Sequence, residues 1–525
     1  MTFAQGEVMQ ATALTFSLIG LDAHPIRVEV DSGRGIAHFN LVGLAEASVR
    51  ESRVRVRAAI QQLGSNLAEH VITINLAPAD LKKSGGSFDL AIAAATLGAL
   101  GKIPAEALAD VALLGELSLT GAVRPVRGVL PALRGAAARG VLRAIVPRDN
   151  AREAASVPGI EVAVCDHLSD LVRHFQEGAP LDGPGSPPSF QPVFGPANVD
   201  LADVRGQHGA RRALEIAAAG GHNLLFIGPP GAGKTMLSRR LPTIMAPITL
   251  DEALEVTAIH SVAGLLSPDR GVLAMRPFRA PHHTISAAGL VGGGDPVRPG
   301  EVSLAHRGCL FLDELCEFRS AVLESLRQPL EDGHVSICRA RARVTFPARP
   351  LLVAAINPCP CGYAGDRSGR CACSSERVRA YRARISGPLL DRIDLHVVLP
   401  PVDVAHLMST ERGEPSTRVR DRVIAARAAQ ADRSRRHGTA STNAALTPRE
   451  LERLAQPDAA GASLLAAAVE RLGLSARAYG KVLRVARTIA DLAGSDAVRA
   501  AHVAEAVHAR LLDRDPAAPL ASAAG

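Results

Sequence analysis

The segment GPPGAGKT at residues 228–235 constrains the fold of this chain more than any other feature of the sequence. It follows the apolar stretch NLLFI and precedes MLSRRL, which has a helical pattern. Glycines let backbone N–H groups close around phosphates at a helix N-terminus, a lysine supplies positive charge, and a Ser/Thr hydroxyl can ligate Mg²⁺. A glycine-rich turn that binds no nucleotide is the alternative, and it does not account for the complete motif and its flanks. We therefore expect a phosphate-binding loop formed by Gly228, Pro229, Pro230, Gly231, Ala232, Gly233, Lys234 and Thr235.

Two acidic residues, Asp313 and Glu314, end the apolar run CLFLDE further along the chain. Alone they would be a common solvated strand end, but after a phosphate-binding loop they have the pattern of a hydrolytic pair. Asp313 is expected to hold Mg²⁺ through water and Glu314 to polarise the attacking water, because phosphoryl transfer depends on positioning and charge neutralisation.

Three short apolar segments have the pattern of buried strands: residues 223–227, 309–312 and 351–356, the last followed by Asn357. Helix-like segments and turns separate them. This alternation predicts an α/β core with a parallel sheet and helices on both faces.

The composition limits the class of protein. A length of 525 residues corresponds to three to four domains, and 47% apolar with 21% charged residues excludes wholesale disorder. Aromatic residues make up only 3% and Trp is absent, so an extended platform for stacking bases is not expected. The net charge of +7 is compatible with a polyanion partner, and any nucleic-acid contact should be made to phosphates.

The distribution of proline and glycine predicts the domain boundaries. Residues 177–196 are dense in both, which suits an extended, exposed linker. The part before them alternates between strand-like and helix-like patterns, such as a strand at 71–78 and a helix at 88–101. We expect an N-terminal domain at 1–176, the linker at 177–196, the α/β core at 197–408, a linker with a helical domain at 409–514, and a frayed tail at 515–525.

The phosphate-binding loop, the DEL motif, the strand ending in Asn357 and LLDRID at 389–394 occur in this order. In this they resemble AAA+ ATPases of the helix-2-insert group, which includes magnesium chelatase and the minichromosome maintenance helicases. The resemblance implies ATP and Mg²⁺ as cofactors and a ring, expected to be a hexamer. It implies that Asn357 is the first sensor, that Arg392 is the arginine finger and that Arg477 in LSARAY is the second sensor, with Arg484 as the alternative.

Residues 276–308, the N-terminal region and LSARAYGKVLRVARTIADL extend the resemblance over essentially the whole chain, to the bacterial ComM/YifB family of magnesium-chelatase-like proteins. ComM is understood as a ring helicase that drives branch migration during integration of transforming DNA, so the resemblance implies a DNA motor. His282 and His283 would then lie in a pore element, with a zinc role as the alternative. A metal-insertion chaperone of the magnesium chelatase type, with a protein client, is the competing function.

The segment EDGHVSICRARARVTF at 331–346 alternates with period two. On a strand or hairpin, residues two apart share a face, so Arg339, Arg341 and Arg343 are expected to project one row of positive charge. A charged row is commonly a solvated edge. In the related helicases this is the hairpin that points into the central pore, so we favour contact with DNA phosphates.

Eight cysteines occur in the chain, and four of them form two CxC pairs nine residues apart. Four thiolates can enclose a structural Zn²⁺ in a tetrahedral site, and free thiols are the alternative. The candidate zinc ligands are Cys359, Cys361, Cys371 and Cys373. The other four are expected to be buried or incidental: Cys165, Cys309, Cys316 and Cys338.

The N-terminal segments KSGGSFDL and GELSLTGAVRPVRGVLPALRGAAARG resemble the proteolytic domain of Lon protease, an α+β fold of the ribosomal-protein S5 domain 2 type. Ser87 falls at the position of the nucleophile. The resemblance places the base, a lysine, within residues 128–133, but residues 103–233 contain no lysine. A serine hydroxyl needs a base within reach, and arginine stays protonated. We therefore expect a Lon-like fold without protease activity, serving as a collar that binds DNA or organises the ring.

The start of the chain has no basic segment followed by a long apolar run, and no stretch offers about 18 apolar residues for a membrane span. We expect a cytoplasmic protein, in which cysteines are reduced or bind metal rather than form disulfides.

Overall fold

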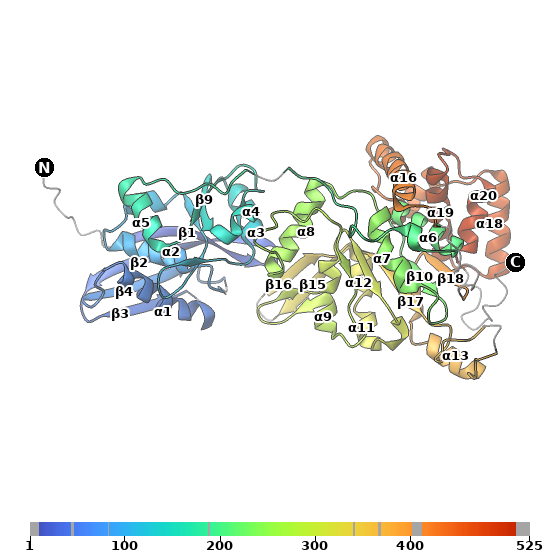
Figure 1. The fold of residues 1–525 in the computed structure, drawn as a ribbon, viewed down its shortest axis with the longest axis horizontal. Helices are drawn as coiled ribbons and strands as arrows, with labels where there is room; N and C mark the ends of the chain where they lie inside the picture. Colours follow the sequence, from blue (N-terminus) through green and yellow to red (C-terminus); the bar gives the residue numbers. More distant parts are fainter. Residues whose placement is uncertain are drawn as a thin grey trace.

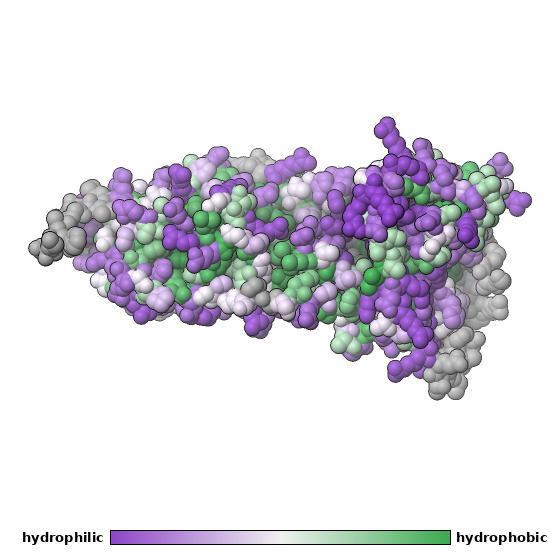
Figure 2. Space-filling view, turned by 90° about the horizontal axis from the view of Figure 1, so that it is seen from above, coloured by the Kyte–Doolittle hydropathy of each residue, from purple (hydrophilic) through white to green (hydrophobic). Residues whose placement is uncertain are grey.

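The structure is a computed structural model that describes residues 10–43, 47–81, 83, 85–186, 189–339, 342–365, 369–401 and 412–510. The molecule is elongated, with the N-terminal sheet at one end and the central sheet together with the C-terminal helices toward the other end (Figure 1). Hydrophilic side chains gather over the end that carries the C-terminal helices, and apolar patches lie nearer the centre (Figure 2). No helix among the described residues is long and apolar enough to cross a membrane.

The N-terminal part is built on a seven-stranded sheet of order β3-β4-β2-β1-β5-β8-β9. The pairs β1–β2 and β2–β4 are antiparallel, and the other neighbours are parallel. The strands are β1 (Gln10–Ile19), β2 (Asp22–Arg34), β3 (His38–Val42), β4 (His70–Ala77), β5 (Val111–Leu113), β8 (Arg143–Pro147) and β9 (Glu161–Cys165). The helices are α1 (Ala47–Gln62), α2 (Asp89–Ala99), α3 (Val129–Ala137), α4 (Ala151–Ala154) and α5 (Leu168–Glu177).

The helix α2 is the centre of this part. Every one of its residues is buried, which its alanine-rich, apolar sequence permits, and it packs against β1 and β2. The buried carboxylate of Asp89 accepts hydrogen bonds from Arg55 Nε at 2.6 Å and from the backbone N–H of Leu117 at 3.1 Å. The expected helix at 88–101 and strand at 71–78 are thus confirmed as α2 and β4.

The central sheet has five parallel strands in the order β11-β14-β17-β10-β18. On β10, Leu224 and Phe226 join one apolar cluster and Leu225 and Ile227 join another on the opposite face. Both faces are therefore covered, which explains why the strand sequences are continuous apolar runs. The strands are β10 (Leu224–Ile227), β11 (Phe278–Arg279), β14 (Cys309–Leu312), β17 (Leu351–Ile356) and β18 (Leu395–Val398). The predicted α/β core is confirmed.

Helices and a short insert surround this sheet. The insert lies between β11 and β14 and consists of α9 (Ala287–Val291), β12 (Gly292–Gly293), β13 (Arg298–Pro299) and α10 (Glu301–Leu304). A hairpin of β15 (His334–Arg339) and β16 (Ala342–Pro347) precedes β17. The surrounding helices are α6 (His208–Gly220), α7 (Lys234–Ile244), α8 (Leu250–Ala263), α11 (Ser320–Glu324), α12 (Arg327–Asp332), α13 (Ser375–Arg382) and α14 (Gly387–Leu390).

The C-terminal part is helical, with α16 (Ser416–His437), α17 (Pro448–Leu454), α18 (Ala459–Leu472), α19 (Ala476–Leu492) and α20 (Ala500–His508). The stretch expected to begin with a linker forms the 22-residue helix α16 instead. Its buried residues recur at helical spacing, and the helix packs against α6, α7 and α19. These buried residues are Ser416, Val419, Val423, Ala426 and Gln430. Because the segment is polar and rich in arginine, its composition did not indicate a helix with a narrow buried stripe.

A buried polar network joins α19 to the edge of the central sheet. His222 Nδ1 lies 3.2 Å from Asp394 Oδ2, and His222 Nε2 lies 2.8 Å from the Thr488 hydroxyl. The ammonium of Lys481 donates to Ile393 O at 3.0 Å and lies 3.3 Å from Asp394 Oδ1. Burial alone would raise the pKa of Asp394, but the hydrogen bond from His222 and the charge of Lys481 hold it well below its usual range.

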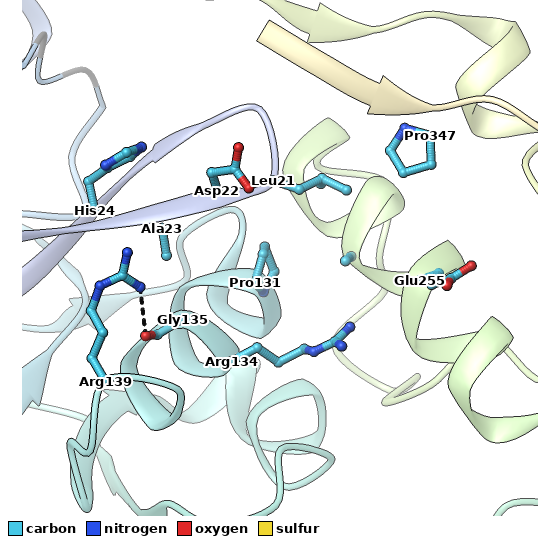
Figure 3. A pocket seen from close by; sticks show the side chains of 11 residues that line it. Leu21, Asp22, Ala23, His24, Pro131, Arg134, Gly135, Arg139, Glu255 and Pro347 are labelled. Atoms are coloured by element: carbon cyan, nitrogen blue, oxygen red, sulfur yellow. Dashed lines mark hydrogen bonds between the residues drawn. The ribbon is translucent and has the colours of Figure 1, made fainter. Parts of the chain in front are cut away.

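The N-terminal part meets the central part along α3 and α8. The N–H of Gly128 donates to Ser261 Oγ at 3.0 Å, and Ser261 Oγ donates to Glu153, which also accepts from the N–H of Leu130 at 2.8 Å. A cleft of about 500 Å³ opens beside this joint, between the β1–β2 turn, α3 and α8 (Figure 3). At the cleft's edge the turn abuts the hairpin, since a Cβ on Gly20 would lie 2.8 Å from Val344 Cγ1.

His306 generates a prediction about acid stability. Its Nδ1 accepts from the N–H of Arg349 at 3.1 Å, so its Nε2–H donates to Glu255 at 3.1 Å. Burial lowers the pKa of His306 to about 4. The charges of Arg307 and Arg349 act in the same direction, and the charge of Glu255 acts in the opposite direction. Between pH 6.5 and 4 the unfolded chain therefore binds a proton that the folded chain does not, and stability falls as pH falls.

We expect the wild-type protein to lose about 3 kcal/mol more unfolding free energy between pH 7 and pH 4 than the variant His306→Gln. Urea denaturation of both proteins across this range, followed by circular dichroism, measures the difference. Equal pH dependence in the two proteins would contradict the prediction.

Candidate functional site

The loop at residues 228–233 joins β10 to α7, and Lys234 is the first residue of that helix. Gly231 and Gly233 have φ of +80° and +89°, a left-handed conformation that favours glycine. The buried ammonium of Lys234 donates to Gly228 O at 2.6 Å, Pro229 O at 3.0 Å and Asn357 Oδ1 at 3.1 Å. Burial lowers the pKa of Lys234, while the nearby charges of Asp313 and Glu314 act in the opposite direction.

The two acidic residues lie at the carboxyl end of β14. Asp313 Oδ2 accepts a hydrogen bond from the Thr235 hydroxyl at 2.7 Å, so two hard oxygen ligands of the kind that Mg²⁺ prefers lie side by side. Glu314 has a φ of +51°, which is unusual for a residue with a side chain, and its side chain is 52% exposed. Backbone strain of this kind is concentrated at functional sites.

Three parallel strands thus bring together the sequence-predicted residues Lys234, Thr235, Asp313, Glu314 and Asn357. The strand β17, which ends just before Asn357, lies between β10 and β14 in the sheet. Ligands of open α/β sheets bind at the carboxyl ends of the strands. The arrangement offers an N-terminal helix end, a buried cation, an oxygen pair for a divalent cation and an exposed carboxylate within one site.

His283 is a neighbour of this site that sequence reasoning assigned to a pore element instead. Its Nδ1 lies 3.4 Å from Glu314 Oε2, and its ring lies edge-on to Phe318. No spacing rule connects the two residues, because the insert folds back onto the end of β14. Among the described residues, His282 and His283 belong to no cluster able to hold a metal ion.

The structure does not bring the three predicted arginines to the phosphate-binding loop of the same chain. Arg392 donates to Arg327 O at 3.0 Å and Pro388 O at 2.7 Å, and it pairs with Glu331. Arg477 is 74% exposed, with Asp391 at 3.4 Å. Arg484, the alternative second sensor, is instead occupied structurally: it donates twice to Leu446 O, at 2.9 and 2.7 Å.

The four cysteines of the CxC pairs form one cluster, with all sulfur atoms within 4.8 Å of one another. Cys359 Sγ lies 3.2 Å from Cys361 Sγ and 3.8 Å from Cys371 Sγ. A tetrahedral Zn²⁺ with bonds of about 2.3 Å places its sulfurs about 3.8 Å apart. The donor set and its spacing therefore fit zinc. Cys165, Cys309 and Cys316 are buried and Cys338 is exposed.

The predicted single row of arginines on the hairpin is wrong. The chain reverses after β15, so Arg343 pairs with Cys338 and shares its exposed face, whereas position 339 pairs with Ala342 on the other face. That other face is buried further down the hairpin, at Val335, Val344 and Phe346. Arg341 lies outside the described residues, as does the side chain of Arg339, and Arg343 remains a basic residue near the tip.

Residues 128–133, where the Lon resemblance places the lysine base, contain no lysine. The buried ammonium of Lys83 donates to Pro78 O, and burial lowers its pKa. The segment at 128–133 forms the start of α3, where Glu153 accepts the N–H of Leu130 and Ser261 Oγ accepts that of Gly128. Lys82 lies outside the described residues.

Three family models match the chain: Magnesium chelatase, subunit ChlI, at residues 200–407; Subunit ChlI of Mg-chelatase, at 28–150; and Magnesium chelatase, subunit ChlI C-terminal, at 413–510. The N-terminal region is also similar to Lon protease 2 of Bacillus subtilis, at 30% identity over 155 residues, 28% of each chain. These matches agree with a magnesium-chelatase-like AAA+ core preceded by a Lon-like part.

Several relatives cover nearly the whole chain. An uncharacterized protein of Mycobacterium tuberculosis is 46% identical over 483 residues, 92% of this chain and 95% of that one. YifB of Escherichia coli is 42% identical over 501 residues, 95% of this chain and 97% of its own. Competence protein ComM of Haemophilus influenzae is 42% identical over 501 residues, 94% and 96% of the two chains. The chain is thus an AAA+ ATPase that belongs to the ComM/YifB family.

Proposed function

We propose that this protein is an ATP-dependent, hexameric DNA motor that promotes branch migration of recombination intermediates, as in natural transformation. The observation that carries the proposal is the convergence of Lys234, Thr235, Asp313, Glu314 and Asn357 on one sheet edge, in a chain similar over 94% of its length to a competence protein. The site supports ATP hydrolysis, and the relative supports DNA as the load.

Each residue has a role in this proposal. The N-terminal N–H groups of α7 and the ammonium of Lys234 bind the phosphates, which requires Lys234 to exchange loop carbonyls for phosphate oxygens. Thr235 and Asp313 hold Mg²⁺, which neutralises charge on the phosphates when bound. Glu314 polarises the attacking water, and Asn357 orients it near the γ-phosphate. His283 holds the Glu314 carboxylate in place, and so links the insert to the catalytic acid.

The arginines support assembly as a ring. Arg392 and Arg477 lie near each other in the fold, because Asp391 precedes Arg392 in the chain and forms an ion pair with Arg477. Neither arginine reaches the phosphate-binding loop of its own chain. We propose that Arg392 completes the site of the adjacent subunit after leaving Glu331, and that Arg477, which is largely exposed, turns to the γ-phosphate. A ring of six copies satisfies both roles.

The proposed load is DNA, bound through its phosphates. Arg339, Arg341 and Arg343 lie close together in the sequence of the hairpin segment, and Arg343 is exposed near the reversal. Sequence-independent phosphate contact suits a motor that moves along DNA of any sequence. Four thiolates, from Cys359, Cys361, Cys371 and Cys373, are proposed to hold a structural Zn²⁺.

A second candidate function is a magnesium-chelatase-type ATPase that serves metal insertion with a protein client. The family matches to magnesium chelatase subunits at 28–150, 200–407 and 413–510 favour it. The two functions share the hydrolytic site and differ in what stimulates it, which makes the stimulus the decisive measurement.

The first prediction from the proposed function concerns ATP turnover. We expect a synthetic four-way junction to stimulate turnover by the wild-type protein, and Lys234→Ala to lower turnover by about 100-fold or more, because it removes the buried cation from the phosphate site. The variant Arg339→Ala/Arg341→Ala/Arg343→Ala should keep basal turnover and lose the stimulation. Its DNA affinity should depend less steeply on salt, with the slope reduced by about one unit for each arginine that binds a phosphate.

Turnover that depends on Lys234 but responds to no form of DNA would reject the DNA motor and favour the protein-client ATPase. Absence of turnover in the wild-type protein under all conditions would reject both functions.

The second prediction separates Arg477 from Arg484. Arg484→Ala should destabilise the helical domain by about 1–3 kcal/mol, because it leaves the buried carbonyl of Leu446 without its donor. Arg477→Ala should change stability by less than about 0.5 kcal/mol, since the side chain is exposed, yet lower ATP turnover by about 10-fold or more. Urea denaturation and steady-state turnover of both variants test this, and the reverse pattern would make Arg484 the sensor.

The third prediction concerns proteolysis. Ser87 has no lysine partner at 128–133, so we expect the purified protein to leave casein intact with or without ATP, at rates indistinguishable from those of Ser87→Ala. Proteolysis that disappears in Ser87→Ala would contradict this and restore a protease function to the Lon-like part.

A further inference from the structure

The cysteine cluster lies directly against the phosphate-binding loop. Gly362 stands between the first and second CxC pairs, and a Cβ at this position would lie 2.7 Å from Cδ of Pro230. Its φ of +86° is also left-handed. Cys359 follows Asn357, the partner of Lys234, by only two positions. The turn that carries Cys359 and Cys361 therefore packs against the phosphate-binding loop at Pro230.

Local contacts shape this turn. The N–H of Gly362 donates to Cys359 O at 2.9 Å, and the N–H of Ala364 donates to Cys359 Sγ at 3.2 Å. Pro358 O accepts from Arg382 Nε of α13 at 3.2 Å. The guanidinium of Arg370, next to the second pair, lies 4.4 Å from the centre of the Tyr363 ring, close to the first pair.

These contacts bring the two CxC pairs together but provide little buried apolar area. Among the four thiols only that of Cys359 belongs to a buried residue. A short, polar segment of this kind gains its stability from a metal ion, because the free energy of metal binding becomes free energy of folding. Four thiolates fill a tetrahedral Zn²⁺ site completely and leave no open position, so the metal is structural.

We propose that Zn²⁺ in this four-cysteine cluster stabilises the nucleotide site. It holds Gly362 against Pro230 and thereby keeps the phosphate-binding loop in the conformation that binds ATP. The inference rests on the proposed ATPase function and adds a metal requirement to it. ATP affinity should then depend on zinc, although no zinc ligand touches the nucleotide.

The test measures zinc per chain by atomic emission and affinity for a fluorescent ATP analogue, in addition to turnover. The wild-type chain should carry one zinc. The variant Cys371→Ser/Cys373→Ser, which alters the pair further from the loop in sequence, should lose the zinc and bind the analogue about 10-fold more weakly. Removal of zinc from the wild-type protein by a chelator, followed by its return, should weaken and restore affinity without any substitution.

Two glycines of the same segment provide a matched pair. Gly362 and Gly365 have φ of +86° and +82°, but a Cβ at 365 meets no atom within 4 Å. Both substitutions to alanine cause the same backbone strain, and only Gly362→Ala pushes on Pro230. We expect Gly362→Ala to retain zinc and lose affinity for the analogue, and Gly365→Ala to retain both.

A wild-type chain without zinc, or unchanged analogue affinity after zinc removal, would overturn the inference. So would equal effects of Gly362→Ala and Gly365→Ala. Failure of the proposed function looks different: the wild-type chain would bind zinc and yet neither bind the analogue nor hydrolyse ATP.

Discussion

The hydrogen bond from Lys234 to Asn357 depends on one constraint, the burial of β10 between β17 and β18. With apolar residues on both faces of β10, the strand cannot shift register without exposing them, and its carboxyl end is fixed relative to that of β17. The phosphate-binding loop starts where β10 ends, the acid pair follows β14 and Asn357 follows β17. A rigid sheet edge thus sets the distances among groups from three separate segments.

The residues that meet at this edge could be predicted from the sequence because each motif is local. GPPGAGKT, the acids after CLFLDE, the asparagine after LLVAAI and the two CxC pairs each carry their residue types at fixed spacing, and the structure brings them to one site. The roles of these residues rest on the family resemblance and on chemistry. The fold class was predictable for the same reason, since buried parallel strands read as continuous apolar runs.

What could not be predicted are contacts between distant segments. His283 meets Glu314 because the insert folds back over the sheet, and no periodicity encodes that path. The arginine-rich segment does form strands, in which alternate residues share a face, but the chain reverses after Arg339, and Arg343 lies on the opposite face of the hairpin. The helix α16 has only a narrow buried stripe amid charged residues, so its composition concealed it. Arg484 matched a motif position, yet its guanidinium serves the carbonyl of Leu446.

The network around Asp394 also determines how parts of the molecule must move together. Lys481 of α19 and Arg510 beyond α20 both bind the carbonyl of Ile393, and Arg510 binds that of Asp394 as well. The backbone next to Arg392 is therefore clamped to the helical domain, so any rotation of α19 carries Arg392 with it. In the ring that we propose, a rotation triggered by the nucleotide of one subunit would reposition Arg392, the proposed arginine finger for its neighbour, and the subunits would pass a mechanical signal in one circular direction.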